Sequence, residues 1–578
     1  MRQIWGVFLE NLEAQFNEAI TKHRNGDVDT ADIVYRKILS INPDHTEARH
    51  MLAVVHLQKG HIKEAEENVR LALKNNGEEA KYSNTLGSIL IEQGRLPEAL
   101  IAFEKALSKD TKFTAAAYNI GTVLLSLNKP RNAENEFRKI LKTEVNEAPI
   151  YCNLASALIK QGQIGEAVEC CRDGLAIHQN NPELGTTLAS ALELSNNLEA
   201  AEEEARKVHE VFPDHALTLL ILARILRRKK AVNRAYNTLK PIFQTSLSNS
   251  DEAEANYEMG LIQDVRKRYA EAFRHFSKCN DILRRSPGVL LCDGDQYLDE
   301  VRDYSRWKKG PSFKKSASIV SAPNLVFFVG FPRSGTTLVE QILKPHPNLI
   351  TTEENSPLPF VETEARKRAA DHGLMYPECL DEWGAEVFDE LRRLFLTKAA
   401  ELVGSFADSV LVDKLPLNIV SLGLVEKLWP DALVLVALRD PRDVCLSCFI
   451  QRFINNNAMI NFLDLERTGT LYAEVMDLWL QYREVLTLPY LEYRYEDLVD
   501  NFDGTIRLIL EFIGVGWHDN ISNYRDSAKR REIRTPSYRE VTAPVHNKAV
   551  QRWKNYQEEL NCISPHLNAF VRAFGYSL

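Results

Sequence analysis

The sequence predicts a multidomain chain in which an all-helical repeat solenoid is followed by an α/β domain with a parallel sheet. Two observations carry this prediction. In the first half, small residues recur at a spacing of 34 residues. In the second half, short apolar runs end in polar loops and are followed by helical patterns, which is typical of βαβ units. The length of 578 residues is sufficient for two or three domains.

The overall composition indicates which partners and which cellular compartment to expect for this protein. The net charge of −9 argues against a chain-wide nucleic-acid binder. Nine scattered cysteines, an odd number, favour a reducing compartment over a disulfide framework. The N-terminal stretch meets acidic residues too early for a secretory signal peptide, and no apolar run is long enough for a membrane span. We therefore expect a cytoplasmic protein with no membrane span and no nucleic-acid partner.

The repeats are defined by two positions of each unit. The 34-residue spacing passes through Gly26, Gly60, Gly94, Asn128, Gly162, Asn196 and Lys230. Five residues after each of these comes an alanine: Ala31, Ala65, Ala99, Ala133, Ala167, Ala201 and Ala235. Glycine or asparagine can end a first helix in the left-handed conformation, and alanine lets a second helix approach closely. One more unit, shifted by three residues, carries Ala272 and Phe276. The pattern predicts stacked helical hairpins.

This array resembles the tetratricopeptide repeat, which combines a 34-residue period with the pattern G and A-x3-F. We assign residues 1–286 to a solenoid of about eight units, residues 287–322 to a connector, and residues 323–578 to the second domain. The resemblance implies a concave groove that docks a peptide or protein partner. A purely scaffolding or self-associating role is the alternative.

The second domain begins with a phosphate cradle of unusual composition. The stretch "FFVGFPRSGTTLVEQIL", from Phe327 to Leu343, has the order strand, glycine loop and helix. Thr336 stands where a P-loop NTPase has lysine, and the cationic residue is Arg333, inside the loop. This loop is poorly suited to binding a triphosphate with its metal ion. The loop suits a smaller anion that needs no metal.

A second anion site is predicted where the stretch "DALVLVALRDPRDVCLSCF" leaves its apolar run. Arg439 stands at the end of the run, and Ser447 follows eight residues later in a helical pattern. An arginine and a hydroxyl converging on one spot suit a second phosphate of the same ligand. The alternative is a helix cap at Asp440 with solvated charges.

Together the two loops resemble those of sulfotransferases that use 3′-phosphoadenosine-5′-phosphosulfate (PAPS), closest to the tyrosylprotein branch. The resemblance continues in "HPNLITTEEN" (His346–Asn355), "VDKLPLN" (Val412–Asn418), "YRYEDLV" (Tyr493–Val499) and "VTAPVHNKAVQRWKNY" (Val541–Tyr556). It covers residues 323–556, and the two halves together resemble bacterial tetratricopeptide–sulfotransferase fusions.

The resemblance implies roles for individual residues, with PAPS as co-substrate and no metal. Glu354 matches the catalytic base, and Glu353 is its alternative or its partner. Arg333 and Lys414 match cations on the sulfuryl group and the leaving phosphate. The implied donor-binding set is Arg333, Ser334, Gly335, Thr336, Thr337, Arg439, Ser447, Tyr495 and Lys548. Asn355 departs from the tyrosylprotein pattern, which puts tyrosine specificity in question.

The function that follows is sulfuryl transfer to an acceptor hydroxyl, on a peptide or protein docked by the repeats. Protein sulfation is one case, and the acceptor could equally be a sugar, a lipid or a metabolite. One alternative is an adaptor, in which the repeats carry the function by binding partners and the second domain binds a nucleotide without turnover. An unusual NTPase or kinase is a third hypothesis, and the missing lysine argues against it.

Overall fold

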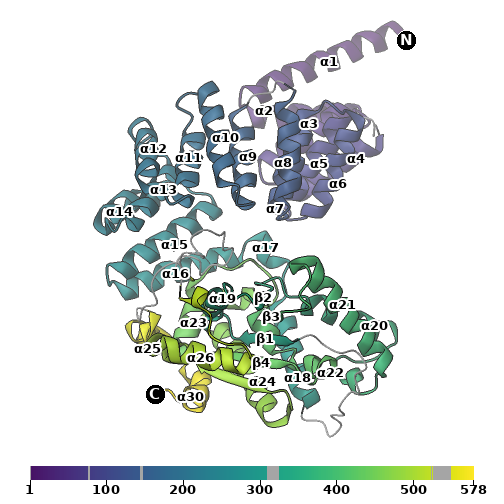
Figure 1. The fold of residues 1–578 in the computed structure, drawn as a ribbon. Coiled ribbons are helices and arrows are strands. Elements are labelled where there is room, and N and C mark those ends of the chain that lie inside the picture. Colours follow the sequence, from purple (N-terminus) through teal and green to yellow (C-terminus); the bar gives the residue numbers. More distant parts are fainter. Residues whose placement is uncertain (1, 76–78, 144–146, 309–323, 523, 525–548) are drawn as a thin grey trace. The chain divides into compact units, whose positions relative to one another are not determined.

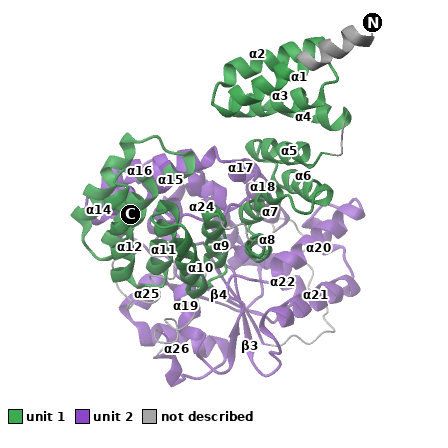
Figure 2. Cartoon of the chain, turned by 90° about the horizontal axis from the view of Figure 1, so that it is seen from above, with its two compact units in different colours: residues 1–251 green, residues 252–578 purple. Residues whose placement is uncertain are grey.

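The computed structural model describes residues 2–75, 79–143, 147–308, 324–522, 524 and 549–578. Figure 2 shows the two compact units of the chain, Met1–Asp251 and Glu252–Leu578. The first unit is helical throughout its described residues, and the second contains a sheet. None of the described helices combines the length and apolar character that crossing a membrane requires.

The first unit is a stack of helical hairpins. Its helices pair as α1 (Arg2–Arg24) with α2 (Val28–Ile41), α3 (Thr46–Gln58) with α4 (Ile62–Asn75), α5 (Ala80–Glu92) with α6 (Leu96–Lys109), α7 (Thr114–Ser126) with α8 (Pro130–Leu141), α9 (Ala148–Lys160) with α10 (Ile164–Ile177), α11 (Pro182–Leu194) with α12 (Leu198–Val211), and α13 (Ala216–Arg228) with α14 (Val232–Leu239). The short helix η1 (Lys240–Gln244) follows α14. The predicted solenoid is confirmed (Figure 1).

The repeat positions have the conformation that their residue types predict. All seven positions of the 34-residue spacing have a positive φ, from 56° at Asn128 to 87° at Gly26. Each lies in the turn between the two helices of a hairpin, where the left-handed conformation ends the first helix. The alanine five residues later is completely buried in all seven units. The 34-residue pattern in the sequence therefore follows from the geometry of the hairpins, which requires these residue types at the turn and at the buried position.

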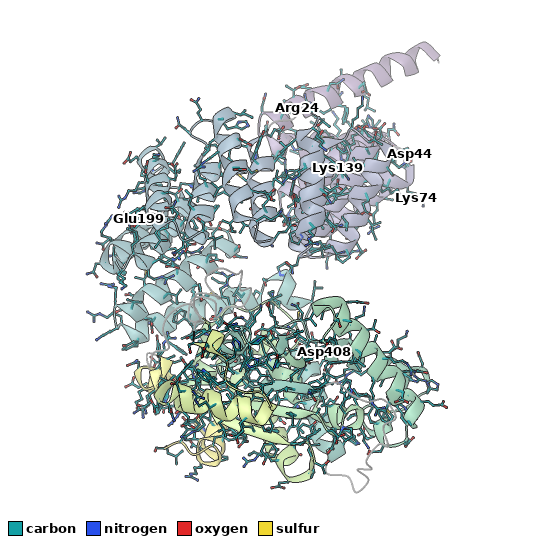
Figure 3. The ribbon with its side chains drawn as sticks, in the orientation of Figure 1. Arg24, Asp44, Lys74, Lys139, Glu199 and Asp408 are labelled. Carbon is teal, nitrogen blue, oxygen red and sulfur yellow. The ribbon has the colours of Figure 1, made fainter. Side chains whose placement is uncertain are left out.

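The second helices of the hairpins have an exposed face and a buried face. Lys139 on α8 and Glu199 on α12 are both exposed (Figure 3). Buried aromatic side chains face the other way: Tyr35, Phe103 and Phe137 have no exposed surface. The division between a polar face and a buried face is that of an amphipathic helix in a layered stack.

The second unit begins with helices that the sequence analysis placed elsewhere. It includes most of α15 (Asn249–Val265), together with α16 (Tyr269–Arg284), α17 (Pro287–Leu290) and α18 (Gly294–Lys308). The helix α15 begins just before the boundary between the two units, which lies between Asp251 and Glu252. The amide of Asn280 on α16 donates to the carbonyl of Phe449, 2.9 Å away. The last repeat hairpin thus packs with the α/β domain, and the described part of the predicted connector is largely helical. The boundaries at residues 286 and 322 stay predictions.

A five-stranded parallel sheet forms the centre of the second unit. Its strands are β1 (Leu325–Gly330), β2 (Leu349–Thr351), β3 (Val410–Lys414), β4 (Leu433–Leu438) and β5 (Tyr490–Arg494), in the order β2-β3-β1-β4-β5. All four pairings are parallel, so the predicted parallel sheet is confirmed. β1 lies between β3 and β4, and all its residues are buried, as expected of a strand covered on both faces.

Helices cover both faces of the sheet (Figure 1). The longer ones are α19 (Thr336–Leu343), α20 (Leu358–Asp371), α21 (Ala385–Val403), α22 (Leu422–Leu428), α23 (Pro441–Ile450), α24 (Leu465–Val485), α25 (Tyr495–Asp500), α26 (Phe502–Ile513) and α30 (Ser564–Ala573). The short ones are η2 (Glu378–Asp381), η3 (Pro416–Ile419), η4 (Met459–Leu463), η5 (Asp519–Ile521), η7 (Arg552–Tyr556) and α29 (Gln557–Leu560). One hydrophobic core lies between the helices α19 and α26 and the sheet face that carries Val326 and Phe328. A larger core lies between the helices α21, α22, α23 and α24 and the opposite sheet face, which carries Phe327 and Val329.

The tight approach of the repeat helices gives a test of the packing. A Cβ placed on Gly87 of α5 would lie 2.5 Å from the buried ring of Phe103, whereas a Cβ on the exposed Gly165 of α10 would meet nothing within 4 Å. We predict that Gly87→Ala destabilises its hairpin by about 1–3 kcal/mol through overpacking. Gly165→Ala, the matched control, should be neutral or stabilising because alanine has the higher helix propensity.

Hydrogen–deuterium exchange of peptides from α5 and α6 measures this effect locally. Faster exchange is expected in Gly87→Ala and unchanged exchange in Gly165→Ala. Equal protection of α5 and α6 in both variants would contradict the packing account.

Candidate functional site

A cavity of the second unit lies at the carboxyl ends of the central strands. It has a volume of about 620 Å³, and its wall includes the loops that follow β1, β2, β3 and β4. Ligands of parallel α/β sheets bind at this edge, because the loops after neighbouring strands meet there. The two anion sites predicted from the sequence both fall on this wall, through Arg333 and Arg439.

The first loop turns sharply from β1 into α19. Arg333 has φ 70° and Gly335 has φ 92°, and the helix begins directly afterwards at Thr336. A Cβ on Gly335 would lie 2.6 Å from the ring of Tyr495, so both the conformation and the space require glycine. Gly335, Thr336 and Thr337 line the cavity, which places the positive end of the α19 dipole at its wall. This arrangement is suited to an anion.

The second loop is bonded directly to the first. Arg333 donates from Nε to the hydroxyl of Ser447, 2.9 Å away, and Arg439 donates to the backbone carbonyl of Arg333 at 2.9 Å. The guanidinium of Arg439 also stacks over the ring of Tyr495 at 4.8 Å. Its Nε is buried and has no acceptor among the described residues. The structure therefore brings these four predicted residues together at one end of the cavity, with a donor left unpaired.

The predicted alternative for the second loop is also present. Asp440 caps α23 by accepting from the backbone N–H of Arg442 at 3.0 Å. Because Arg439 points to the first loop while Asp440 caps the helix, the cap and the cationic site coexist. Asp443, one turn on, accepts from the backbone N–H groups of Gln551 and Trp553, both at 2.7 Å. Burial raises the pKa of Asp443 to about 6. These bonds hold the returning C-terminal segment against α23.

Glu354 faces the cavity from the loop after β2 and is bound from behind by Lys414. The Lys414 ammonium lies 2.9 Å from Glu354 Oε1 and 3.0 Å from Glu340 Oε2. Lys414 is completely buried, whereas the Glu354 side chain is 40% exposed and lines the cavity. Burial alone would lower the pKa of Lys414, but the two carboxylates raise it above the usual range. The lysine is therefore held as a cation behind Glu354.

The two adjacent glutamates that the sequence left open point to different partners. Glu353 has φ 54° and forms an ion pair with Lys344, whereas Glu354 pairs with Lys414. Glu354 lines the cavity and Glu353 is not among the lining residues. This geometry favours Glu354 as the group that meets a ligand.

A buried carboxylate fixes the loop that carries both glutamates. Asp413 on β3 accepts from the hydroxyls of Thr352 and Ser356, at 2.9 and 2.6 Å, and from the amide of Asn418 at 3.2 Å. Thr352 also accepts from the backbone N–H of Lys414. Burial raises the pKa of Asp413 to about 6. The loop is thus tied at residues 352 and 356, on both sides of Glu354.

Another part of the cavity wall is formed by residues that the sequence analysis missed. Tyr297 and Glu300 reach it from α18, and Glu362 and Arg366 reach it from α20. Arg366 lies 2.8 Å from Glu362, which also accepts from the hydroxyl of Ser421 at 2.6 Å. Burial raises the pKa of Glu300 above its ordinary value. A signal was present: apolar residues recur every three positions along α18, at Leu298, Val301, Tyr304 and Trp307.

Some predicted residues lie elsewhere. Ser334 is 2% exposed, and neither it nor Ser447 is a lining residue, although Ser447 accepts a hydrogen bond from the lining residue Arg333. Lys548 lies outside the described residues. Arg552, which belongs to the same C-terminal stretch as Lys548, pairs with Asp264 of α15 at 3.1 Å. Among the residues that the structure describes, no group of three or more His, Cys, Asp or Glu side chains is arranged to hold a metal ion.

Comparison with known proteins assigns both halves of the chain. Residues 323–519 match the sulfotransferase family, and residues 50–113 and 148–181 match the tetratricopeptide repeat. These matches support a chain in which tetratricopeptide repeats precede a domain similar to the sulfotransferase family. The helix α18 and its two lining residues precede the matched part of the sulfotransferase domain.

The relatives are distant. An uncharacterized protein of Aquifex aeolicus is 24% identical over 57% of this chain and 43% of its own length. Protein-tyrosine sulfotransferase 1 of Danio rerio is 26% identical over 42% of this chain and 70% of its own length. A solved tetratricopeptide repeat protein from Parabacteroides merdae is 16% identical, with a TM-score of 0.38, over 43% of this chain and 99% of its own. The chain thus spans less than half of the first of these relatives.

The raised pKa of Asp413 predicts a pH-dependent stability difference. A carboxyl whose folded-state pKa, about 6, exceeds its ordinary 3.8 contributes stability that is present at low pH and lost as the pH rises through 6. We predict that Asp413→Asn destabilises the second unit by about 1–3 kcal/mol near neutral pH, because one amide oxygen replaces two acceptors. The deficit should widen as the pH falls from 6 toward 4.

Urea unfolding followed by tryptophan fluorescence measures this difference, since only Trp5 of the seven tryptophans lies in the first unit. Asp408→Asn is the matched control, an exposed aspartate two residues before the same strand (Figure 3). A deficit that stays constant or narrows at lower pH would show that Asp413 is not the titrating group.

Proposed function

We propose that the chain transfers a sulfuryl group from PAPS to an acceptor hydroxyl. The observation that carries the proposal is the meeting of two cationic loops and the Glu354 carboxylate at a single cavity. Arg333 and Arg439 lie on loops after neighbouring parallel strands, and Glu354 lies on the same wall. A ligand with two separate phosphate groups and a reactive centre near a base fits this set.

The residues at the donor end fit PAPS group by group. The N-terminus of α19, with Thr336, Thr337 and Arg333, would hold the 5′-phosphosulfate. Arg439, which lines the cavity, and Ser447 would hold the 3′-phosphate. Tyr495, already stacked on Arg439, is placed to contact the nucleoside. PAPS supplies the sulfuryl group, and the protein supplies orientation and charge.

The transfer uses Glu354 as general base. Glu354 takes the proton of the acceptor hydroxyl as the hydroxyl oxygen bonds to sulfur. The bond from sulfur to the bridging phosphate oxygen breaks, and its electron pair stays on that oxygen as 3′-phosphoadenosine-5′-phosphate (PAP) leaves. Arg333 and the α19 N-terminus offset the charge that develops there, which lowers the barrier. Lys414 was assigned from the sequence as a further cation on the leaving group. That assignment stays a prediction, and the structure binds its ammonium to Glu354 and Glu340.

The proposal extends to a hydroxyl acceptor and to docking of a peptide or protein by the repeats. The match to protein-tyrosine sulfotransferases supports a tyrosine hydroxyl, whereas Asn355 departs from that branch. Tyr297, Glu300 and Arg366 line the same cavity outside the two anion loops and would face an acceptor.

Replacing the base provides the test. We predict that Glu354→Gln lowers the rate of sulfuryl transfer about 10²–10⁴-fold, because the hydroxyl proton loses its acceptor, while the affinity for PAP is retained. Transfer from radiolabelled PAPS is measured with the full chain against a panel of tyrosine peptides, simple phenols, sugars and lipids. Glu353→Gln, one residue away and paired with Lys344, is the control and should keep wild-type transfer.

Each outcome has a separate meaning. Equal transfer by Glu354→Gln and wild type would remove Glu354 as base, and a matching loss in Glu353→Gln would assign the role to both residues. Tight PAP binding with no transfer to any acceptor would favour the adaptor over the enzyme.

A further inference from the structure

A buried ion triad lies behind the wall of the cavity. Lys414, at the end of β3, binds Glu354 on one side and Glu340 of α19 on the other, at nearly equal distances of 2.9 and 3.0 Å. Glu354 opens to the cavity, whereas Glu340 is 1% exposed. One lysine is thus shared between a carboxylate that meets the ligand and a carboxylate that meets only protein.

The burial of Glu340 is costly and incompletely compensated. Its Oε2 contacts Lys414, and its Oε1 is buried without a hydrogen-bond partner among the described residues. Burial raises the pKa of Glu340, and Lys414 opposes that rise. An apolar residue would fill the same space without an unpaired oxygen. The buried charge of Glu340 acts on the Lys414 ammonium and, through it, on Glu354.

We propose that Glu340 is a positioning residue, which shares Lys414 with Glu354 and so keeps Glu354 fixed at the wall and able to accept a proton. A lysine bound to Glu354 alone would hold that carboxylate as an anion and make it a poor base. Sharing divides the lysine charge between two carboxylates. The proposal rests on the proposed function, in which Glu354 is the base.

Other charges face this triad and are accounted for. Glu353 lies beside Glu354 but is paired with Lys344. Asp413 precedes Lys414 and is bonded to Thr352, Ser356 and Asn418. Arg333 lines the same cavity as Glu354 and donates to Ser447. Glu340 is therefore the carboxylate that competes most directly for Lys414.

The sharing predicts opposite effects of two substitutions. In Glu340→Gln, the whole charge of Lys414 acts on Glu354 and favours its ionised form. In Lys414→Gln, two carboxylates face each other without a cation, which favours the protonated form. Because both carboxylate oxygens lie about 3 Å from one nitrogen, they are within about 6 Å of each other, a range at which a charge shifts a titration by one unit or more.

The test follows protonation of Glu354 directly, without donor or acceptor. Carbodiimide with glycine methyl ester labels protonated carboxyls, and mass spectrometry of the peptide around Glu353 and Glu354 reads each residue against pH. We expect the labelling midpoint of Glu354 to fall by about 1 pH unit in Glu340→Gln and to rise by about 1 unit in Lys414→Gln. The midpoint of Glu353, in the same peptide, should stay unchanged.

Glu426→Gln is the matched control, since Glu426 is also a buried glutamate with an unpartnered oxygen but lies on α22, outside the cavity lining. It should leave the midpoint of Glu354 unchanged. A midpoint that does not move in folded Glu340→Gln overturns the proposal. If Glu340→Gln does not fold, Lys414→Gln decides, because the absence of a rise there removes the coupling.

The labelling readout tests the positioning role of Glu340 independently of the proposed sulfuryl transfer. The labelling shifts can be present or absent whether or not the chain binds PAPS. In the transfer assay, Glu340→Gln should lower kcat with little change in the KM for PAPS, because the donor loops are unaltered. A rise in KM with kcat unchanged would instead assign Glu340 to donor binding and contradict its role through Lys414.

Discussion

The parallel pairing of β1 with both β3 and β4 is the constraint on which the rest of the second unit depends. Gly330, the last residue of β1, pairs with Ala437 near the end of β4, so the loops that follow both strands start at the same edge. Phe328 pairs with Lys414, which ends β3 on the other side. Three strand ends therefore converge on one cavity. A change of register would separate Arg333 from Arg439 and both from Lys414.

Around this edge, buried polar groups fix the side chains that face the ligand. On the β4 side, Arg439 donates to the backbone carbonyl of Arg333, Arg333 donates to Ser447, and Asp443 holds the returning chain. On the β3 side, Asp413 ties the loop of Glu354, and Lys414 holds its carboxylate. Such hydrogen-bond and ion-pair networks restrict rotamers and so preorganise a site before a ligand arrives.

The repeats were predictable from the sequence because their geometry recurs: each left-handed turn residue and each buried alanine appears seven times. The placement of Arg333 and Arg439 at one edge of the sheet was predictable because each follows a buried strand, and the ends of neighbouring parallel strands share an edge. The triad of Glu340, Lys414 and Glu354 was not, since it joins three elements across tertiary distance, and no sequence spacing encodes that. The contribution of α18 was missed because its amphipathic pattern lies among turn residues that resemble a linker.

Calorimetric binding of PAP to the full chain, without magnesium and with ADP and ATP as controls, tests the central claim most directly. The account predicts binding that requires the 3′-phosphate, absent from ADP, and that weakens at least about tenfold, or about 1.4 kcal/mol, in Arg439→Ala. Equal or tighter binding of ATP, or no binding of PAP at all, would contradict the assignment of the two loops to a single donor with two phosphate groups.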